Sequence, residues 1–508
     1  MKNPLFEKLF KKNQNSERAF LFFEEEKFLT FSEYVGMIHE FSSSLRGVGL
    51  KPGDRVALKI EKSHYFLAVY GACIHRGLIF LPVNDNSTTE ELLYFLKDSG
   101  SKLLISTQTQ ILDLKEHVTE SDLLFETLEK DGSGTLTDLS KALHHATDPV
   151  VRNLEDIAAL LYTSGTTGRP KAATITQENL ISNAETLLEC WEFSRDDLLI
   201  HALPVYHTHG LFVATNVILL ASAGMFFLEK FDLETVIDLI PKSTTIMGVP
   251  TYYSRLLDSP KLTKKMFENM RLIISGSAPL TKEVSDQFFH KTGKRILERY
   301  GMTETNMISS NLYKGERKAG TVGLPLPGVE VRVCTPETGK HLLDGQVGEI
   351  EVRGKNVFSG YWRMPKKTYE SFRSDGFFRT GDLGKFDSEG FLEIVGRLKD
   401  LIITGGLNVY PKEVENILNT FSGIKESAVI GLPHSDFGEA VFGVIVCEEG
   451  YELELNILEK FLKKRLAHYK CPKAYSSQHS LPRNNLGKVL KNLLRDKYKN
   501  YFNHGKNV

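Results

Sequence analysis

The chain has 508 residues, which is room for two or three domains. Acidic and basic residues balance to a net charge of −1, so no global positive field points to nucleic acid as a partner. A hydrophobic content of 41% and a charged content of 25% are typical of a globular protein with an ample core.

The cysteines stand far apart without a C-x-x-C pair, which argues against a zinc ribbon or a disulfide framework. They favour a reducing compartment, so we expect a cytoplasmic protein. The N-terminal segment lacks the apolar stretch of a secretory signal. Leu198–Leu228 contains no Asp, Glu, Lys or Arg, but it includes Pro204 and several histidines. We predict a buried strand and a buried helix there, and no stable membrane insertion.

Strands and helices alternate through the first part of the chain. The pattern predicts strands at Arg55–Ile60, Leu78–Val83 and Leu103–Ser106, with helices at Ser63–Arg76 and Thr88–Lys97 between them. This order indicates a parallel sheet covered by helices. Polar residues 130–148 predict a surface connection. Further strands are predicted at residues 244–249, 272–275 and 295–298.

The pattern changes after about residue 320. Short predicted strands at residues 330–334, 348–353 and 391–395 are separated by Gly-rich turns, which indicates a β-rich subdomain. An α+β pattern follows, with a helix from Pro411 and strands at residues 427–432 and 441–447. We therefore predict an α/β N-terminal domain over residues 1–396 and a small α+β C-terminal domain over residues 397–508, joined by a hinge.

The strongest chemical signal is the segment Leu161–Lys171, with the sequence LYTSGTTGRPK. Its glycines let the backbone approach a ligand closely, and its hydroxyl and amide groups can form an anion-binding concavity. Lys171 adds positive charge, which suits a polyphosphate. A P-loop is excluded, because Gly165 and Gly168 are too close and Ala172 stands where that motif needs Ser or Thr.

Further motifs follow in order along the chain: ERYGMTET at residues 298–305, RTGDL at 379–383, GRLKD at 396–400, TGG at 404–406 and NNLGK at 484–488. With these motifs the chain resembles the adenylate-forming superfamily, which includes acyl-CoA synthetases, peptide-synthetase adenylation domains and beetle luciferases. Within this superfamily, the sequence at residues 204–212, 248–255, 275–279 and 301–307 most resembles that of malonyl-CoA synthetases. Ala172 and Asn484 depart from the common motifs, although neither position carries a catalytic group.

The resemblance implies a reaction in two steps, with ATP, Mg²⁺ and coenzyme A. A carboxylate attacks the α-phosphorus of ATP and expels pyrophosphate, and a thiol then attacks the acyl-adenylate and expels AMP. The first step needs no general base, because a carboxylic acid with a pKa near ~4 is already ionised at pH ~7. It needs positioning and stabilisation of phosphate charge.

The resemblance also implies the roles of individual residues. Lys488 would reach the α-phosphate, Glu304 and Thr163 would hold Mg²⁺, and Thr303 would lie near the α-phosphate. The remaining ATP-binding candidates are Ser164, Gly165, Thr166, Thr167, Gly168 and Lys171 at the phosphates, Tyr300 and Gly301 at the adenine, and Asp382 and Arg397 at the ribose. Each has a local structural alternative: Asp382, for example, could simply close a Thr-Gly-Asp turn.

The second step implies a rotation of the small domain about Lys399, with Gly405 and Gly406 beside the pantetheine arm. The candidate acyl pocket comprises His207, Thr208, His209, Ser277 and Met307, and His207 is also a catalytic candidate. A dicarboxylate needs a cation for its distal end. We expect Arg255 in this role, although Arg255 could instead pair with Asp258; the other candidate is Arg271.

The first interpretation is an ATP-dependent malonyl-CoA synthetase. Another short-chain or aryl acyl-CoA synthetase, a luciferase-type oxygenase and an enzyme that loads a carrier protein remain open. No carrier segment is recognisable in the residues after Lys488. The expected partners are small molecules; the sequence does not indicate an oligomeric state.

Overall fold

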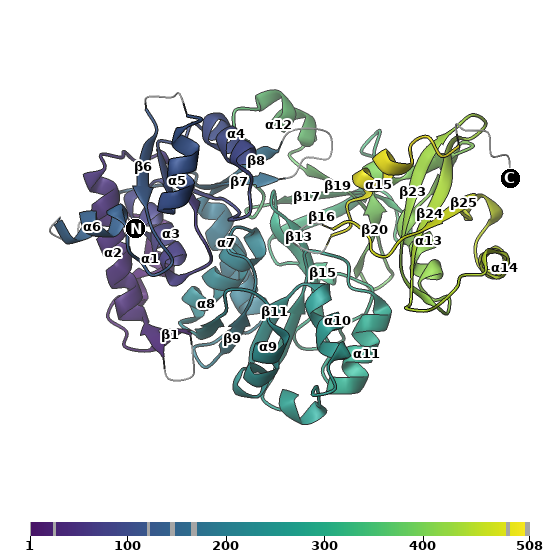
Figure 1. Cartoon of the computed structure of the whole chain (residues 1–508), viewed down its shortest axis with the longest axis horizontal. Helices are drawn as coiled ribbons and strands as arrows, with labels where there is room; N and C mark the ends of the chain where they lie inside the picture. Colours follow the sequence, from purple (N-terminus) through teal and green to yellow (C-terminus); the bar gives the residue numbers. More distant parts are fainter. Residues whose placement is uncertain are drawn as a thin grey trace. The chain divides into compact units, whose positions relative to one another are not determined.

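The computed structural model describes residues 2–23, 27–118, 122–142, 148–163, 170–483 and 488–502. It divides into two compact units (Figure 1). The first comprises Met1–Glu330 and Val352–Phe378, and the second comprises Val331–Glu351 and Arg379–Val508.

The first unit contains two mixed sheets that are parallel at their centres. One sheet has the strand order β15-β14-β13-β12-β11-β9-β10-β1-β2. Its strands are β1 (Ala19–Phe22), β2 (Phe28–Thr30), β9 (Leu198–His201), β10 (Gly224–Phe227), β11 (Thr245–Gly248), β12 (Leu272–Ser275), β13 (Leu297–Met302), β14 (Asn306–Ser310) and β15 (Leu324–Pro325).

The other sheet has the order β18-β8-β7-β4-β3-β5-β6. Its strands are β3 (Arg55–Lys59), β4 (Ile79–Pro82), β5 (Leu103–Ser106), β6 (Leu124–Thr127), β7 (Ile157–Thr163), β8 (Lys171–Thr176) and β18 (Gly360–Tyr361). The predicted βαβαβ order is confirmed here, because β3, β4 and β5 pair in parallel and α3 and α4 connect them.

Helices lie against both sheets (Figure 1). They are α1 (Pro4–Leu9), α2 (Phe31–Gly47), α3 (His64–Arg76), α4 (Thr89–Ser99), α5 (Gln108–Lys115), α6 (Thr135–Ala142), α7 (Gln177–Cys190), α8 (Asn216–Ala221), α9 (Leu233–Leu239), α10 (Pro250–Asp258), α11 (Lys282–Thr292) and α12 (Pro365–Ser371). The predicted cap of α4 is confirmed: Thr88 and Glu91 form a capping box, which satisfies two backbone donors.

Residues 130–148 are more than the predicted surface connection. They contain α6, whose Leu136 is buried, and its carbonyl oxygen accepts a hydrogen bond from Ser44 Oγ in α2 at 2.8 Å. The apolar segment 198–228 forms β9, a π-helical segment (His209–Thr215), α8 and β10, as the prediction of buried strand and helix required. No helix in the described part of the chain is long and apolar enough to cross a membrane.

The second unit holds most of a sheet with the order β16-β17-β19-β20, which is the predicted β-rich subdomain. A further sheet has the order β22-β21-β24-β23, with β25 beside β24. The elements are β16 (Val329–Cys334), β17 (Gly348–Gly354), β19 (Phe378–Phe386), β20 (Leu392–Arg397), β21 (Ile402–Thr404), β22 (Leu407–Val409), β23 (Ile424–His434), β24 (Gly438–Cys447), β25 (Ala474–Ser477), α13 (Pro411–Leu418), α14 (Leu455–Lys463) and α15 (Lys491–Tyr498). The predicted domain boundary at Gly396 lies inside this unit and stays a prediction.

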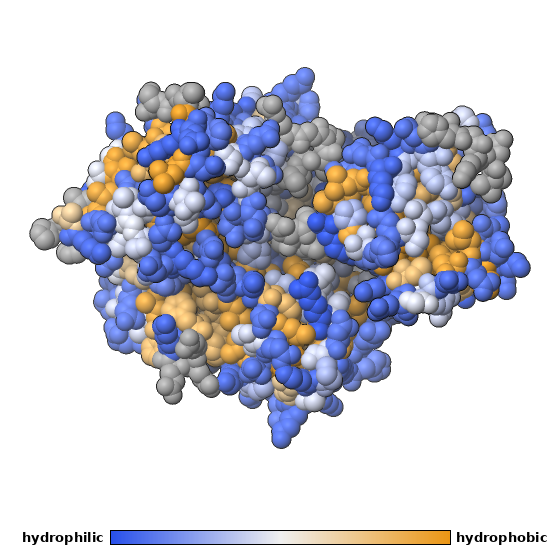
Figure 2. Space-filling model, viewed as in Figure 1, coloured by the Kyte–Doolittle hydropathy of each residue, from blue (hydrophilic) through white to orange (hydrophobic). Residues whose placement is uncertain are grey.

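Apolar side chains fill the interior of each unit, with Phe and Leu side chains between the sheets and helices. Figure 2 shows that polar and charged residues cover much of the visible face, with smaller apolar patches between them. This is the distribution expected from the composition.

Candidate active site

The phosphate-loop candidates begin at the end of β7. Thr163 pairs with Lys171, the first residue of β8, and its Oγ1 donates to the Lys171 carbonyl oxygen at 3.3 Å. The candidates Ser164, Gly165, Thr166, Thr167 and Gly168 lie outside the described residues. The hairpin therefore places Thr163 and Lys171 at the two ends of the glycine-rich segment.

Glu304, Tyr361 and Lys171 form a chain of contacts. The Tyr361 hydroxyl donates to Glu304 Oε1 at 3.0 Å, and Lys171 Nζ lies 4.8 Å from the centre of the Tyr361 ring. Burial raises the pKa of Tyr361, as do the Glu304 charge and their hydrogen bond. Burial lowers the pKa of Lys171, as does Lys367, while Glu304 opposes this shift. Glu304, the predicted Mg²⁺ ligand, and Lys171, a predicted phosphate ligand, therefore both interact with Tyr361.

The turn that carries Thr303 and Glu304 joins β13 to β14. Gly301 is needed before it, because a Cβ there would lie 2.0 Å from the carbonyl oxygen of Asn306. Asn356 fixes the turn by donating to the carbonyl oxygens of Thr305 and Met307 at 2.7 and 3.1 Å. Tyr300, Thr303 and the Glu304 carboxylate are consequently presented from a braced hairpin.

The candidate acyl-pocket loop passes from His207 into the π-helical segment. Gly210 is needed there, because a Cβ would lie 2.1 Å from the Pro204 carbonyl oxygen. His209 Nδ1 and Ser277 Oγ are 3.2 Å apart, so the structure joins two candidates separated in sequence. Burial lowers the pKa of His207 to about 4, and burial and the Arg299 charge lower that of His209. Both imidazoles are therefore neutral at physiological pH.

Arg299 lies beside this loop, fully enclosed by the protein. Its guanidinium occupies the space over Gly276, where a Cβ would lie 2.4 Å from Arg299 Cζ. Burial lowers the pKa of Arg299 to about 9, which still leaves it cationic at neutral pH. Its Nε and Nη2 atoms are buried and have no hydrogen-bond partner among the described residues.

Further orphan polar atoms lie on the candidate acyl-pocket loop and next to Gly276 in the chain. Thr208 Oγ1, His209 Nε2 and Ser275 Oγ are also buried without a partner within the described residues. Buried polar atoms nearly always have partners in folded proteins, because an unmade hydrogen bond costs about 1–3 kcal/mol. A buried cation with two orphan N–H groups therefore favours a polar, anionic ligand at Arg299.

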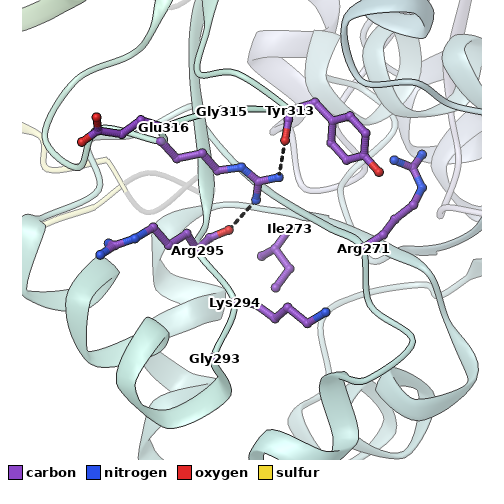
Figure 3. A pocket seen from close by; sticks show the side chains of 9 residues that line it. Arg271, Ile273, Gly293, Lys294, Arg295, Tyr313, Gly315 and Glu316 are labelled. Atoms are coloured by element: carbon purple, nitrogen blue, oxygen red, sulfur yellow. Dashed lines mark hydrogen bonds between the residues drawn. The ribbon is translucent and has the colours of Figure 1, made fainter.

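The two arginines that sequence reasoning selected are placed differently. Arg255 is exposed in the last turn of α10. Arg271 precedes β12, and its Nε and Nη2 donate to both carboxylate oxygens of Asp197 at 2.7 Å. Figure 3 shows Arg271 beside Tyr313 and Lys294 at a surface hollow. Arg271 therefore already has a carboxylate partner within the fold.

In the second unit, Asp382 and Arg397 pair across β19 and β20, with Arg397 Nε 2.8 Å from Asp382 Oδ1. Asp382 lies in β19 after Gly381, which takes a φ of 70°. The Asp382 backbone N–H donates to Thr380 Oγ1 at 3.0 Å. Burial lowers the pKa of Lys488 to about 8; the Arg397 charge adds to this shift, and Asp382 opposes it. The charges of Asp382 and Arg397, the ribose candidates, thus both act on the pKa of Lys488, the candidate catalytic lysine. Residues 484–487 of the last motif lie outside the described residues.

The hinge candidate Lys399 lies in a 3₁₀ turn, Leu398–Asp400. Asp400 Oδ1 accepts from Arg495 Nη2 of α15 at 2.6 Å. Gly405 and Gly406 form the turn between β21 and β22 with φ angles of 57° and 78°, which favour glycine. The glycine loop is therefore a tight hairpin turn, compatible with the predicted role beside a pantetheine arm.

Sequence reasoning missed Tyr361 and Arg299. Tyr361 belongs to a Gly-Tyr-Trp segment without a chemical signature of its own. Arg299 was part of the ERYGMTET motif, and the available signal was its charge, beside Glu298, in a strand whose other residues are uncharged.

Comparison with known proteins agrees with this arrangement. The family model described as AMP-binding enzyme matches residues 8–362, and AMP-binding enzyme C-terminal domain matches residues 413–488. A malonate–CoA ligase from Arabidopsis thaliana is 34% identical over 487 residues, which are 89% of this chain and 79% of the relative. A feruloyl-CoA synthase from an Amycolatopsis species is 33% identical over 92% of this chain and 94% of the relative.

Among solved structures, ATP-bound MatB from Rhodopseudomonas palustris superposes with a TM-score of 0.96 at 47% identity, covering 99% of this chain and 100% of that one. The family matches and the CoA-ligase relatives together define the reaction class, with ATP and CoA as substrates. The chain belongs to the AMP-binding enzyme family of the adenylate-forming superfamily, and it is an AMP-forming acyl-CoA synthetase.

Proposed function

We propose that this enzyme is a malonyl-CoA synthetase, which converts malonate, ATP and CoA to malonyl-CoA, AMP and pyrophosphate. The observation that carries the proposal is the buried guanidinium of Arg299, whose Nε and Nη2 have no partner among the described residues. Nε and Nη2 form one edge of the guanidinium, and they can bind both oxygens of a carboxylate.

The same edge binds carboxylates elsewhere in this protein. Arg271 uses Nε and Nη2 for Asp197, and Arg353 uses them for Glu330. Arg379 uses both nitrogens for Glu349. Arg299 presents this edge at the candidate acyl pocket, beside Ser277 and His209, so a substrate carboxylate is a chemically matched partner.

A short dicarboxylic acid suits the buried Arg299 side chain. Its guanidinium lies over Gly276, in the space that a side chain at that position would fill. A monocarboxylate would leave Nε and Nη2 of this buried guanidinium without a hydrogen-bond acceptor, which costs free energy. The name of the Arabidopsis relative, malonate–CoA ligase, supports malonate as the first acid to test.

We assign the chemistry of adenylation to the residues that the motifs single out. The acid is already ionised, so the protein contributes charge stabilisation and orientation. Lys488 would stabilise the α-phosphate as pyrophosphate leaves, and Thr163 and Lys171 would hold the terminal phosphates with the glycine-rich segment. Asp382 would accept hydrogen bonds from the ribose hydroxyls, with Arg397 orienting its carboxylate at 2.8 Å. Tyr300 would flank the adenine.

The residues also fit a magnesium ion. Mg²⁺ prefers one or two carboxylates together with phosphate oxygens and water. Glu304 is a buried carboxylate in a hydrogen bond with Tyr361, so one oxygen is oriented by a phenol. Glu304 and the Thr163 hydroxyl would hold the ion, which when bound would offset phosphate charge.

The thioester step would use the other candidates of the second unit. Lys399 would be the pivot, and Gly405 and Gly406 would form the side-chain-free wall beside the pantetheine arm. His207, neutral through the lowering of its pKa to about 4, would line the acyl pocket without adding charge.

The decisive experiment measures pyrophosphate release and acyl-CoA formation with a panel of malonate, methylmalonate, succinate, acetate, butyrate and ferulate. The proposal predicts the highest kcat/KM for malonate. A higher value for a monocarboxylate or for ferulate would contradict the malonate assignment and leave the acyl-CoA synthetase class intact.

A further inference from the structure

A second group of cations lies away from the candidate active site. Arg271, Ile273, Lys294, Arg295, Tyr313 and Arg317 line a surface hollow of about 370 Å³, which we call the basic hollow (Figure 3). Arg271 precedes β12, and Lys294 and Arg295 precede β13. The hollow is therefore at the N-terminal ends of the strands whose C-terminal ends carry Ser277 and Thr303. A strand rise of about 3.3 Å per residue separates Arg271 from Gly276 by roughly 16 Å.

The charges of the basic hollow are only partly balanced. Arg271 is paired with the buried Asp197, and Arg295 with Asp286 at 3.4 Å. Arg317 instead donates to the backbone carbonyl oxygens of Leu312, Arg295 and Tyr313, which hold it in place without neutralising it. Burial lowers the pKa of Arg317, as does repulsion from Arg271, while Tyr313 opposes this shift. The fixed positive charge thus exceeds the negative charge around it.

Lys294 adds a further positive charge to the hollow. Within the described part of the chain, no carboxylate forms an ion pair with its ammonium group. Figure 3 shows its side chain directed along the hollow toward Arg271, whereas the side chains of Arg295 and Glu316 point away. Glu316 also lines the hollow, but within the described residues its carboxylate forms no ion pair with Lys294 or Arg317.

The hollow also offers apolar contact. The Arg271 guanidinium lies between two rings, 5.1 Å from the centre of Phe193 and 5.0 Å from that of Tyr313. Such stacking holds a guanidinium flat and rigid. Ile273 and the Tyr313 ring provide an apolar wall beside these cations. A phosphate group could accept from Arg317 and Lys294 while the rest of its molecule contacts Ile273 and Tyr313.

We propose that the basic hollow is a second anion-binding site, which takes the phosphate group of a small molecule and is separate from the site of adenylation. The anion would be held by Lys294 and by the N–H groups of Arg317 that do not bind carbonyl oxygens. Because the whole chain is nearly neutral, with a net charge of −1, this attraction is local and is not a consequence of global charge.

The test compares pyrophosphate binding to three proteins by isothermal titration calorimetry at low salt. These are the wild type, Lys294→Glu and the control Lys282→Glu, which reverses an exposed charge on α11. The wild type and the control are expected to show two classes of site. Lys294→Glu is expected to weaken one class at least ~tenfold, as for the loss of a charged hydrogen bond, and to leave adenylation unchanged. Equal isotherms for all three proteins would overturn the proposal.

A local signal separates the hollow from the adenylation site. The chain has two tryptophans, and the carbonyl oxygen of Trp191 accepts a hydrogen bond from Arg271 Nη1 at 3.0 Å. In a Trp362→Phe background, the emission of Trp191 is expected to change as the class of site that depends on Lys294 fills. The same change is expected to be absent when Lys294→Glu is added. Titration with inorganic phosphate, pyrophosphate and AMP then distinguishes a free oxyanion from a nucleotide. Absence of any Lys294-dependent change with all three probes would refute the site.

Discussion

Lys62 donates from the interior of the first unit to His201, with Nζ 2.9 Å from His201 Nδ1 and 2.8 Å from its carbonyl oxygen. Nδ1 is then an acceptor, so Nε2 carries the proton and donates to the Gly210 carbonyl oxygen at 2.9 Å. Burial lowers the pKa of both side chains well below their usual ranges. This pair therefore fixes Gly210, next to His209 of the acyl-pocket loop.

Lys62→Met is expected to loosen that loop, because Met fills similar volume and cannot donate to His201. We predict that KM for the acid rises about tenfold, as for an unsatisfied buried polar group, while KM for ATP is unchanged. The measurement is steady-state kinetics with each substrate varied. Lys59→Met, which removes a buried lysine without a His201 contact, is the control. Parallel rises in both KM values would indicate general destabilisation.

Arg299→Met is expected to separate acid selectivity from stability. Loss of the cation should lower the ratio of kcat/KM for malonate to that for butyrate by at least about a hundredfold, the effect of leaving a buried carboxylate unpaired. The thermal midpoint without substrate should not fall and is expected to rise, because a buried cation with orphan N–H groups is removed.

Arg255→Met provides the comparison for this ratio. Its side chain is exposed, so we expect a smaller change than for Arg299→Met. A large fall for Arg255→Met with none for Arg299→Met would return the distal carboxylate to Arg255.

Adenylation is expected to depend on the protonation of Lys488, whose pKa is lowered to about 8 by burial. The cation is present below this pH and is lost above it. The value of kcat/KM for ATP should therefore fall as pH rises through about 8, since this parameter reports the free enzyme. Lys488→Arg keeps the charge and should remove this alkaline fall. Pyrophosphate exchange measures the effect, and an identical fall in both proteins would contradict the assignment.

Lys488→Ala is expected to lower acyl-adenylate formation at least ~10²-fold, the scale for loss of one charge-stabilising donor. The reaction of synthetic malonyl-adenylate with CoA should persist. Lys399→Pro and Gly406→Leu are expected to show the opposite preference, with adenylation better preserved than acyl-CoA production. Single-turnover assays of each half-reaction test this difference, and equal losses in folded variants would exclude distinct roles.

Glu304→Gln is expected to raise the Mg²⁺ concentration needed for half-maximal activity at least ~tenfold, because the carboxylate charge is lost. Tyr361→Phe removes only the hydroxyl that donates at 3.0 Å, so a smaller rise is expected. A magnesium titration at saturating ATP measures both. An unchanged requirement in Glu304→Gln would remove Glu304 from the metal site.

The sequence by itself determined the reaction class and much of the fold. Its motifs are local: the alternation of strands and helices predicts the β3–β5 sheet, and the Thr88 cap needs only neighbouring residues. The resemblance of the ordered motifs to the adenylate-forming superfamily made Glu304, Asp382 and Lys488 candidates. Local signals of this kind depend on backbone geometry within a few residues, which the sequence specifies directly.

Tertiary structure decided which distant side chains meet. Arg271 and Arg299 have the same chemistry, but Arg271 precedes β12 and binds Asp197, whereas Arg299 in β13 is buried over Gly276 with an orphan edge. Tyr361 contacts Glu304 in a segment that the Phe358 N–H joins to the Glu304 carbonyl oxygen at 2.8 Å. Burial and pairing of a charge depend on the packing of strands far apart in the chain, and this packing determines the free energy of each ion.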